Sequence, residues 1–237
     1  MFKKNVIYNF YDKEKKDQPR GIMVTIHGLT FRFQKDRVES ASELIPKYSD
    51  TLLDYGCNDG DFLKKNVKKF NRGIAVDISN NALKKAKENL SGSNIEFING
   101  NTDEENLPIL NETADTVVTT DVIEHVFDPV NLIREFNRIL KLNGTLIIAT
   151  PNIAWLPHRI SLLFGKRPRT SWSEGWDGGH ISYFTFSDLK EVLKNLGFKV
   201  IKRTTGGSFW FLRTWWPSLL GANIVIKAKK IRAVNPR

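Results

Sequence analysis

The fold is decided by the stretch Thr51-Leu-Leu-Asp-Tyr-Gly-Cys-Asn-Asp-Gly-Asp-Phe-Leu63. Its apolar start predicts a buried strand that ends at Asp54, and a loop containing Gly56 and Gly60 leads into a Lys-rich helix. Glycine tolerates positive φ and lets a ligand approach the backbone, because it has no Cβ. The free N–H groups at a helix start favour polar or anionic ligand groups. The stretch therefore predicts a nucleotide-binding turn. The alternative is an ordinary βα turn that contains two glycines.

Composition and length set the class of protein. The 237 residues suit one domain with an insertion or a small cap. The single cysteine, Cys57, excludes a disulfide framework and favours a reducing compartment, so we expect a cytoplasmic location. The charged N-terminus has no apolar h-region, and no window holds about eighteen apolar residues, so neither a signal peptide nor a membrane-spanning helix is expected. The net charge of +10 favours anionic partners, although a solvated Lys-rich surface also explains it.

Strand and helix patterns alternate regularly from Thr51 onward. This alternation predicts an α/β fold with a doubly wound, mostly parallel sheet. The predicted strands lie at 52–54, 73–76, 95–98, 116–119, 146–149, 199–202 and 223–228. The predicted helices lie at 34–47, from about 60, and at 80–89, 132–140 and 187–196, with Asn143-Gly144 capping the fourth of these.

The alternation is interrupted once, after Pro151. We expect a single domain in which residues 1–33 form an N-terminal arm, with a strand or hairpin within 21–33, and 34–151 form the core. Residues 152–180 interrupt the alternation and predict a cap insertion, and 181–237 complete the sheet. The cap has an apolar part followed by a basic part, which suits either an anionic membrane surface or the cover of a lipid-like or aromatic acceptor. Its residues are Trp155, Leu156, Ile160, Leu163, Phe164, Lys166, Arg167 and Arg169.

Polar residues follow the predicted strands. Asp77 comes directly after the second strand, where a carboxylate can accept hydrogen bonds from both hydroxyls of a ribose. The alternative is that Asp77 caps the next helix, although Ser79 and Asn80 are better placed for that role. Cys57 lies within the glycine loop, where a small side chain is needed, so we expect it to pack rather than to act as a nucleophile.

These motifs resemble the class I S-adenosylmethionine-dependent methyltransferases, near the ubiquinone-biosynthesis O-methyltransferases. The spacing D-x-G-C-x-x-G from Asp54 is similar to their motif I, and the match covers 51–152 and extends to 179–185 and 195–198. The resemblance implies a Rossmann-like, mostly parallel, seven-stranded sheet with a cap insertion, and S-adenosylmethionine as cofactor. Asn58 stands where many members have glycine, and Asn tolerates the left-handed conformation better than other residues.

The resemblance also implies roles for single residues. The glycine loop would hold the methionine part of the cofactor, Asp77 its ribose and Asn101 its adenine amino group, although Asn is also a common turn residue. Asp121 would lie beside the transferred methyl group. The cofactor-binding residues implied in this way are Asp54, Gly56, Cys57, Gly60, Asp77, Ile78, Asn101 and Asp121.

Asp121, Glu124 and His125 form a set that carries further chemistry. In a helix, these positions would face one way. The set resembles the magnesium site of the ubiquinone O-methyltransferases and of small-RNA 2′-O-methyltransferases, in which a second histidine lies downstream as His180 does here. The resemblance implies Asp121, Glu124, His125 and His180 as ligands of Mg²⁺ or Mn²⁺. Two alternatives stay open: His125 as a general base without metal, and a structural role for all of these side chains.

The sequence as a whole predicts methyl transfer from S-adenosylmethionine to an acceptor oxygen. The acceptor would be a small molecule, a lipid or a saccharide, and Asp121, Glu124 and His125 would handle its proton. RNA 2′-O-methylation is the alternative, motivated by the net charge and by His180, although no RNA-binding motif is recognisable. A cofactor-binding partner protein without its own activity is the non-enzymatic alternative. Peripheral contact with a membrane is a further possibility for the cap.

Overall fold

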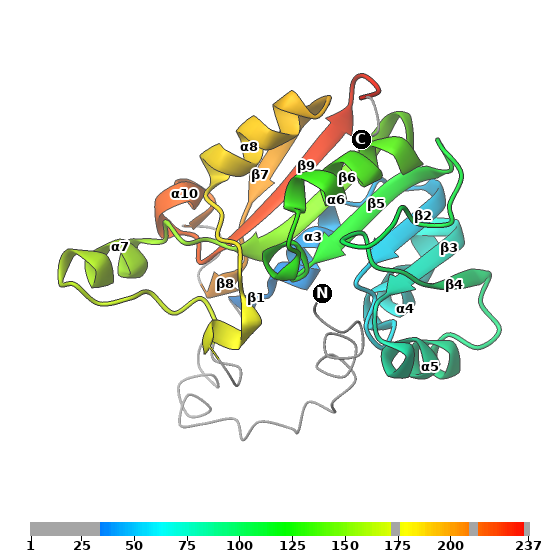
Figure 1. The fold of residues 1–237 in the computed structure, drawn as a ribbon, viewed down its shortest axis with the longest axis horizontal. Helices are drawn as coiled ribbons and strands as arrows, with labels where there is room; N and C mark the ends of the chain where they lie inside the picture. The colour runs from blue at the N-terminus through cyan, green and yellow to red at the C-terminus, as the bar shows by residue number, and fades with distance from the viewer. Residues whose placement is uncertain (1–33, 172–175, 209–212, 235–237) are drawn as a thin grey trace.

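A computed structural model of the protein describes residues 34–171, 176–208 and 213–234. Its centre is a seven-stranded sheet, as expected (Figure 1). The strands follow the spatial order β4 (Ile95–Asn99), β3 (Phe70–Asp77), β2 (Ser49–Tyr55), β5 (Ala114–Thr120), β6 (Leu140–Pro151), β9 (Asn223–Lys230) and β7 (Phe198–Thr204). Neighbours are parallel from β4 to β6, and β9 pairs antiparallel with both β6 and β7. The prediction of a mostly parallel sheet is therefore confirmed.

Helices cover both faces of this sheet. Leu52 and Leu53 are adjacent in β2, yet they belong to different apolar clusters, because successive strand residues point to opposite faces. Leu52 packs with side chains of α3 (Arg37–Leu44), α4 (Asp61–Asn66) and α5 (Asn80–Asn89). Leu53 packs with side chains of α6 (Pro129–Ile139) and α8 (Phe186–Asn195). Burial on both faces explains why the strands are nearly continuous apolar runs, and it confirms the doubly wound architecture.

The fourth predicted helix differs from the observed one at both ends. Asp128 caps α6 by accepting a hydrogen bond from the Asn131 N–H, so the helix begins at Pro129 rather than at Leu132. The helix ends at Ile139, and the chain enters β6 at once. Asn143 has a φ of 69° inside β6, where the register with β5 shifts. The prediction that Asn143-Gly144 caps the helix was therefore wrong, because the pair forms an irregularity within the strand.

Several short elements complete the fold. β1 (Gln34–Lys35) and β8 (Gly207–Ser208) form a two-stranded antiparallel ribbon, and η2 (Val67–Lys69) and α10 (Pro217–Leu220) are short helical turns. The predicted N-terminal arm 1–33, with its strand or hairpin, lies outside the described residues. No helix among the described residues has both the length and the apolar character needed to cross a membrane.

The chain leaves the sheet after β6, at Pro151. Asn152 forms a parallel bridge with Phe184, so the start of the segment 152–180 lies beside the chain that follows its end. The segment contains α7 (Leu156–Leu163), which projects from the body of the molecule, and η4 (Trp176–Gly179) (Figure 1).

The parallel strands bring the candidate residues to one edge. β2, β3, β5 and β6 run in the same direction, so their last residues, Tyr55, Asp77, Thr120 and Pro151, lie at the same edge of the sheet. The glycine loop, Asp77 and the Asp121–His125 stretch therefore follow neighbouring strands. A hollow of about 320 Å³ lined by Pro46, Asp115 and Gly144 lies at the opposite edge and contains none of these residues.

Candidate active site

The glycine loop after β2 has the conformation that its sequence predicts. Gly56, Asn58 and Gly60 have φ angles of 81°, 48° and 83°, all in the left-handed region. A Cβ on Gly56 would lie 2.1 Å from Cγ2 of Val122, so only glycine fits there. Asn58 adopts the left-handed conformation, which Asn tolerates better than other residues that could replace glycine.

Asp54 lies at the base of this loop and is buried. Its Oδ2 atom has no hydrogen-bond partner among the described residues. Burial, with a smaller contribution from the negative charge of Asp77, raises the pKa of Asp54 to about 8. A buried carboxylate with an unsatisfied oxygen fits a cationic ligand group such as an α-ammonium group, which would offset the cost of its ionisation.

Asp77 ends β3 and fixes the loop from the other side. Its Oδ2 accepts a hydrogen bond from the Asn58 N–H at 2.9 Å, and its Oδ1 accepts one from the Ser79 N–H at 2.8 Å. The side chain of Ser79 caps α5 by accepting from the Ala82 N–H. Helix capping is thus the role of Ser79, and Asp77 supports the loop, with Ile78 following it at the same edge.

Cys57 and Asn101 have structural contacts of their own. Cys57 is buried in the apolar cluster with Phe62 and Leu90, and burial raises the pKa of its thiol. This confirms packing as its role in the free protein. Asn101 is buried too, and its Oδ1 accepts a hydrogen bond from the Asp103 N–H, as a turn residue does.

The Asp121–His125 stretch is not a regular helix. Asp121 has a φ of 60°, and a 3-10 turn, η3, spans Ile123–His125. The Asp121 carboxylate turns toward α3, where its Oδ2 lies 2.5 Å from Nε of Arg37. The expected convergence of all three side chains on one helix face does not occur, because the chain bends at Asp121.

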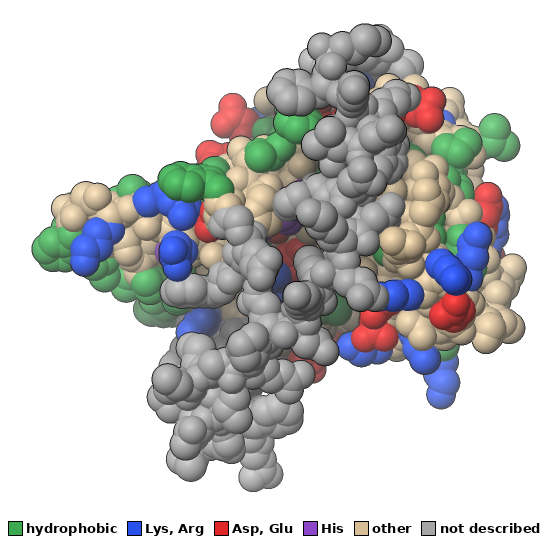
Figure 2. Space-filling view, turned by 60° about the horizontal axis from the view of Figure 1, so that its bottom comes forward, with side chains coloured by type: hydrophobic (Ala, Val, Ile, Leu, Met, Phe, Trp, Pro, Cys, Tyr) green, Lys and Arg blue, Asp and Glu red, His purple; other side chains and the backbone are tan. Residues whose placement is uncertain are grey.

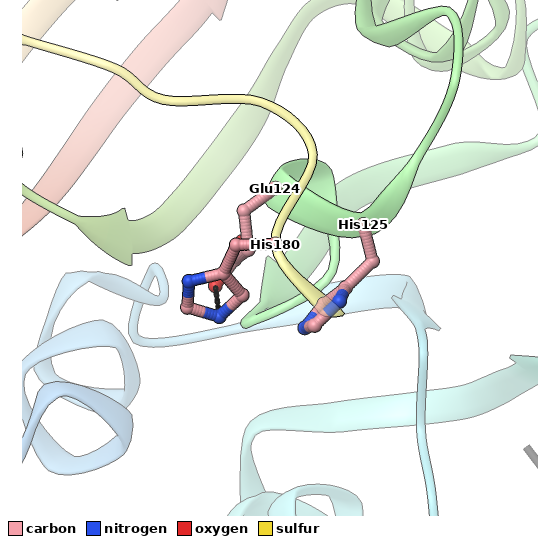
Figure 3. A group of neighbouring side chains, drawn as sticks. All are labelled: Glu124, His125 and His180. Atoms are coloured by element: carbon pink, nitrogen blue, oxygen red, sulfur yellow. Dashed lines mark ion pairs between the residues drawn. The ribbon is translucent and has the colours of Figure 1, made fainter. Parts of the chain in front are cut away.

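Glu124, His125 and His180 do converge. One ligand atom from each side chain lies within 4.8 Å of the others. Figure 3 shows Glu124 and His125 on η3 and His180 on the chain that returns from the cap. The N–H groups of Ile181 and Ser182 both donate to the Glu124 carbonyl oxygen, which holds His180 against η3. The structure thus brings together three of the four predicted metal ligands and pairs the fourth, Asp121, with Arg37.

Burial controls the charges in this cluster. It raises the pKa of Glu124 to about 8, and the negative charge of Asp121 adds to the effect. It also lowers the pKa of His180 to about 4, with a further contribution from His125. Glu124 Oε1 and His180 Nε2 lie 3.9 Å apart, and burial disfavours the charged form of both groups. Glu124 Oε2 accepts a hydrogen bond from Thr150, whereas its Oε1 has no hydrogen-bond partner among the described residues.

Hydrogen bonds fix the orientation of both imidazoles. Nδ1 of His125 lies 3.1 Å from the Gly179 carbonyl oxygen, which can only accept, so Nδ1 carries the proton. Nδ1 of His180 lies 2.7 Å from the Thr170 hydroxyl, which in turn lies 2.7 Å from Oδ2 of Asp177. Because a carboxylate only accepts, Thr170 donates to Asp177 and accepts from His180. In both rings the lone pair is therefore on Nε2, the atom available as an acceptor or metal ligand.

The structure adds four residues that the sequence did not single out, namely Arg37, Thr150, Thr170 and Asp177. Asp177 is buried, which opposes its ionisation, but hydrogen bonds from Thr170, Ser171 and Tyr183 outweigh burial and lower its pKa. Only Asp177 carried a usable signal, because it lies three residues before His180 in the Gly-rich part of the cap.

The resemblance implies two bound groups, S-adenosylmethionine and a metal ion, and the residues of the site fit them to different degrees. For S-adenosylmethionine, the left-handed loop, the buried Asp54 and the position of Asp77 all suit the cofactor. For a metal, atoms bound at about 2.1–2.3 Å lie at most about 4.6 Å from one another, so the 4.8 Å spread requires a small contraction. Two imidazoles and one carboxylate suit Mn²⁺ better than Mg²⁺, which prefers oxygen ligands.

Comparisons with known proteins agree with this geometry. A family model described as a methyltransferase domain matches residues 27–203. An uncharacterized protein of Methanocaldococcus jannaschii is 31% identical over 72% of this chain and 74% of that protein. A ubiquinone biosynthesis O-methyltransferase of Parvibaculum lavamentivorans is 24% identical over 70% of this chain and 64% of that protein, just under two thirds of its length. The crystal structure of magnesium protoporphyrin IX methyltransferase from Synechocystis PCC 6803, with bound SAH, superimposes with a TM-score of 0.64 at 14% identity, over 96% of this chain and 99% of that chain. At that identity the likeness shows the fold.

Proposed function

The chain belongs to the S-adenosylmethionine-dependent methyltransferase family, and from this premise we propose that it methylates an acceptor oxygen. The sulfonium methyl group would pass to a hydroxyl of a small molecule, a lipid or a saccharide. The C–S bond breaks as the O–C bond forms, S-adenosylhomocysteine leaves, and the hydroxyl proton passes to a base. Positioning and exclusion of water supply most of the catalysis in such a transfer.

We place the cofactor at the carboxyl edge of β2 and β3. Asp54 would face the ammonium group of the cofactor, and Asp77 would face its ribose. Each carboxylate oxygen of Asp77 can accept a hydrogen bond beyond the one that it already receives. Gly56 and Gly60 keep the loop backbone open to the methionine part. The other residues of this cofactor site are Cys57, Ile78, Asn101 and Asp121. The buried Oδ2 of Asp54 is the observation that supports a cationic ligand group here.

The convergence of Glu124, His125 and His180 carries the proposal of an oxygen acceptor. His125 and Glu124 would receive the acceptor proton, and Asp121, held by Arg37, would border the same space. The ubiquinone biosynthesis relative is named as an O-methyltransferase, which agrees with this choice of acceptor atom. The whole chain would act as one methyltransferase domain, with 152–180 as its cap.

We extend the proposal to a divalent cation held by Glu124, His125 and His180. Such an ion would bind the acceptor hydroxyl and lower its pKa. Of the two ions expected from the sequence, Mg²⁺ and Mn²⁺, the donor set favours Mn²⁺, and Asp121 would contribute only if its contact with Arg37 opened. The lone Cys57, buried and reduced, agrees with a cytoplasmic location.

The test is calorimetric titration with S-adenosylmethionine and S-adenosylhomocysteine, with and without Mn²⁺ or Mg²⁺, followed by an acceptor screen. We expect saturable cofactor binding and a separate Mn²⁺ site that Glu124→Gln weakens by about tenfold or more. Asp50→Asn, at the opposite edge of the sheet, is the control. Absence of cofactor binding would overturn the proposed function, and unchanged Mn²⁺ affinity in Glu124→Gln would remove the metal.

RNA is the second candidate acceptor, because the net charge is +10 and His180 joins Glu124 and His125. A salt-sensitive gel shift with RNA would favour it, and no binding at low salt would exclude it. A cofactor-binding protein without activity is the remaining alternative. It would be supported if the cofactor bound but no acceptor of any class became methylated.

A further inference from the structure

The projecting helix α7 exposes an unusual amount of apolar surface. Ile160, Leu162, Leu163 and Phe164 are all exposed, and the Leu163 side chain is 84% exposed. Figure 1 shows α7 as an extension of the molecule, and Figure 2 shows hydrophobic side chains at the end of this extension. Contiguous apolar surface of this kind marks an interaction site more often than ordinary surface. The four residues 160, 162, 163 and 164 are called the apolar tip below.

Cations flank the apolar tip in the sequence. Arg159 precedes it, and Lys166, Arg167 and Arg169 follow it, all exposed. The sequence 152–171 contains neither Asp nor Glu. Figure 2 shows Lys and Arg side chains next to the hydrophobic ones on this extension. An apolar end bordered by exposed cations complements a surface that is apolar inside and anionic outside.

We propose that the apolar tip of α7 inserts into the interface of an anionic lipid bilayer, with Arg159, Lys166 and Arg169 against the lipid headgroups. The apolar side chains would leave water for the acyl boundary. The long Lys and Arg side chains would reach the phosphates while their stems lie along the tip. A protein partner would need matching carboxylates and an apolar groove. An anionic bilayer has charged headgroups over an apolar interior along its whole surface.

The base of this extension is held rigidly and leads to the active site. The His158 imidazole lies 3.1 Å from the Asn152 carbonyl oxygen and 3.0 Å from that of Arg169, so it joins the outgoing and returning chains. Arg167 stacks on Trp176 at 4.5 Å and contacts the Asp177 carboxylate at 3.4 Å. Docking would therefore hold Thr170 and His180 near the headgroups. This narrows the proposed acceptor to a lipid or lipid-linked molecule, a step that rests on the proposed function, whereas docking itself does not.

Vesicle co-sedimentation of the full chain tests the docking. The vesicles are phosphatidylcholine with about 30% phosphatidylglycerol, compared with phosphatidylcholine alone, at low and raised salt. We expect binding to the anionic vesicles that weakens with salt and falls by at least about tenfold in Leu163→Asp/Phe164→Asp. Leu110→Asp is the matched control, because Leu110 is 83% exposed on a different loop and should leave binding unchanged.

A fluorophore reports insertion directly. An environment-sensitive label on Leu163→Cys should shift its emission to the blue with anionic vesicles, and the same label on Leu110→Cys should not. Cys57 is buried and common to both proteins, so it cancels in the comparison. Three results would overturn the proposal: no binding at low salt, binding that the tip variant leaves unchanged, or a lipid-free dimer that the tip variant dissociates. Cofactor affinity, measured in parallel, shows that the variants fold and keeps a failure of the proposed function separate from a failure of docking.

Discussion

The hydroxyl oxygen of Thr170 lies 2.7 Å from Nδ1 of His180 and 2.7 Å from Oδ2 of Asp177. A hydroxyl has one proton, and the carboxylate can accept but not donate, so the direction of both hydrogen bonds is determined. Asp177 orients Thr170, and Thr170 orients the proton of His180. The Nε2 lone pair of His180 therefore faces Glu124 and His125.

Replacing Thr170 with valine should weaken this arrangement without changing the size of the side chain. Without the hydroxyl, Nδ1 of His180 loses its acceptor, and Oδ2 of Asp177 loses one of its donors. We expect Mn²⁺ affinity, and activity once an acceptor is known, to fall by about 10- to 100-fold. Thr170→Ser, which keeps the hydroxyl, should retain most of both. Equal loss in the two variants, measured by calorimetry, would contradict a role in orienting His180.

Asp77 gives a second prediction, on cofactor affinity. Asp77→Ala should raise the Kd of S-adenosylmethionine by about 10- to 100-fold, because a hydrogen bond to a charged group contributes about 1.5–3 kcal/mol. Because Asp77 also holds the N–H groups of Asn58 and Ser79, part of the loss could come from the loop.

Two ligands separate these causes. Calorimetry with adenosine and 2′,3′-dideoxyadenosine compares binding with and without the ribose hydroxyls. If Asp77 binds the ribose, Asp77→Ala should weaken adenosine binding and leave the weaker binding of the dideoxy compound unchanged. A similar loss for both compounds would assign Asp77 to loop support alone. Asp50→Ala, at the other edge of the sheet, should change neither.

The pH dependence of stability follows from the raised pKa of Asp54. The folded protein keeps this carboxyl protonated up to about pH 8, whereas the unfolded chain releases the proton near the ordinary value of about 3.9. Between these values the folded state binds more protons, so its contribution to stability is present at low pH and is lost as pH rises. Glu124 acts in the same direction.

Asp54→Asn isolates this contribution. Relative to the native protein, the variant should gain stability between about pH 6 and pH 8, by at most about 1.4 kcal/mol per pH unit. Urea unfolding at several pH values measures the difference. Asp61→Asn, an exposed position at the start of α4, should give a profile parallel to that of the native protein. A parallel profile for Asp54→Asn as well would contradict the assignment of the raised pKa to Asp54.

Local patterns predicted the fold well, because most of its signals are contained in short stretches. The helix Asn80–Asn89 has the bounds predicted, since Ser79 caps it. The start of α6 was missed because the cap, Asp128, and the first helical residue, Pro129, lie before the apolar pattern begins. The irregular pairing around Asn143 depends on the neighbouring strand β5, which no local pattern contains.

The site could be predicted only in part, for a similar reason. Glu124 and His125 are adjacent in sequence, and the resemblance supplied His180. Arg37 is 84 residues from Asp121, and its contact depends on how α3 packs over the ends of β5 and β9. Thr170 has no distinguishing sequence signal, because its contact with His180 exists only once the chain around His180 folds back onto η3.

Gly56 offers a last prediction, in which backbone strain and steric conflict can be measured separately. Gly56→Ala adds a Cβ at a φ of 81° and 2.1 Å from Cγ2 of Val122. Left-handed strain costs about 1–2 kcal/mol, and displacing Val122 adds about 1–3 kcal/mol. Gly92 has nearly the same φ, 80°, but no atom within 4 Å of an added Cβ, so Gly92→Ala measures the strain alone.

The double variant Gly56→Ala/Val122→Ala completes the comparison. Removing Cγ2 takes away the conflicting atom, so the double variant should recover part of the stability lost in Gly56→Ala, after correction for Val122→Ala alone. Cofactor affinity should follow, because the loop can then return to its native position. If Gly56→Ala were no less stable than Gly92→Ala, the close packing of the glycine loop against η3 would be wrong. The contact that places the glycine loop beside Glu124 and His125 would then be wrong as well.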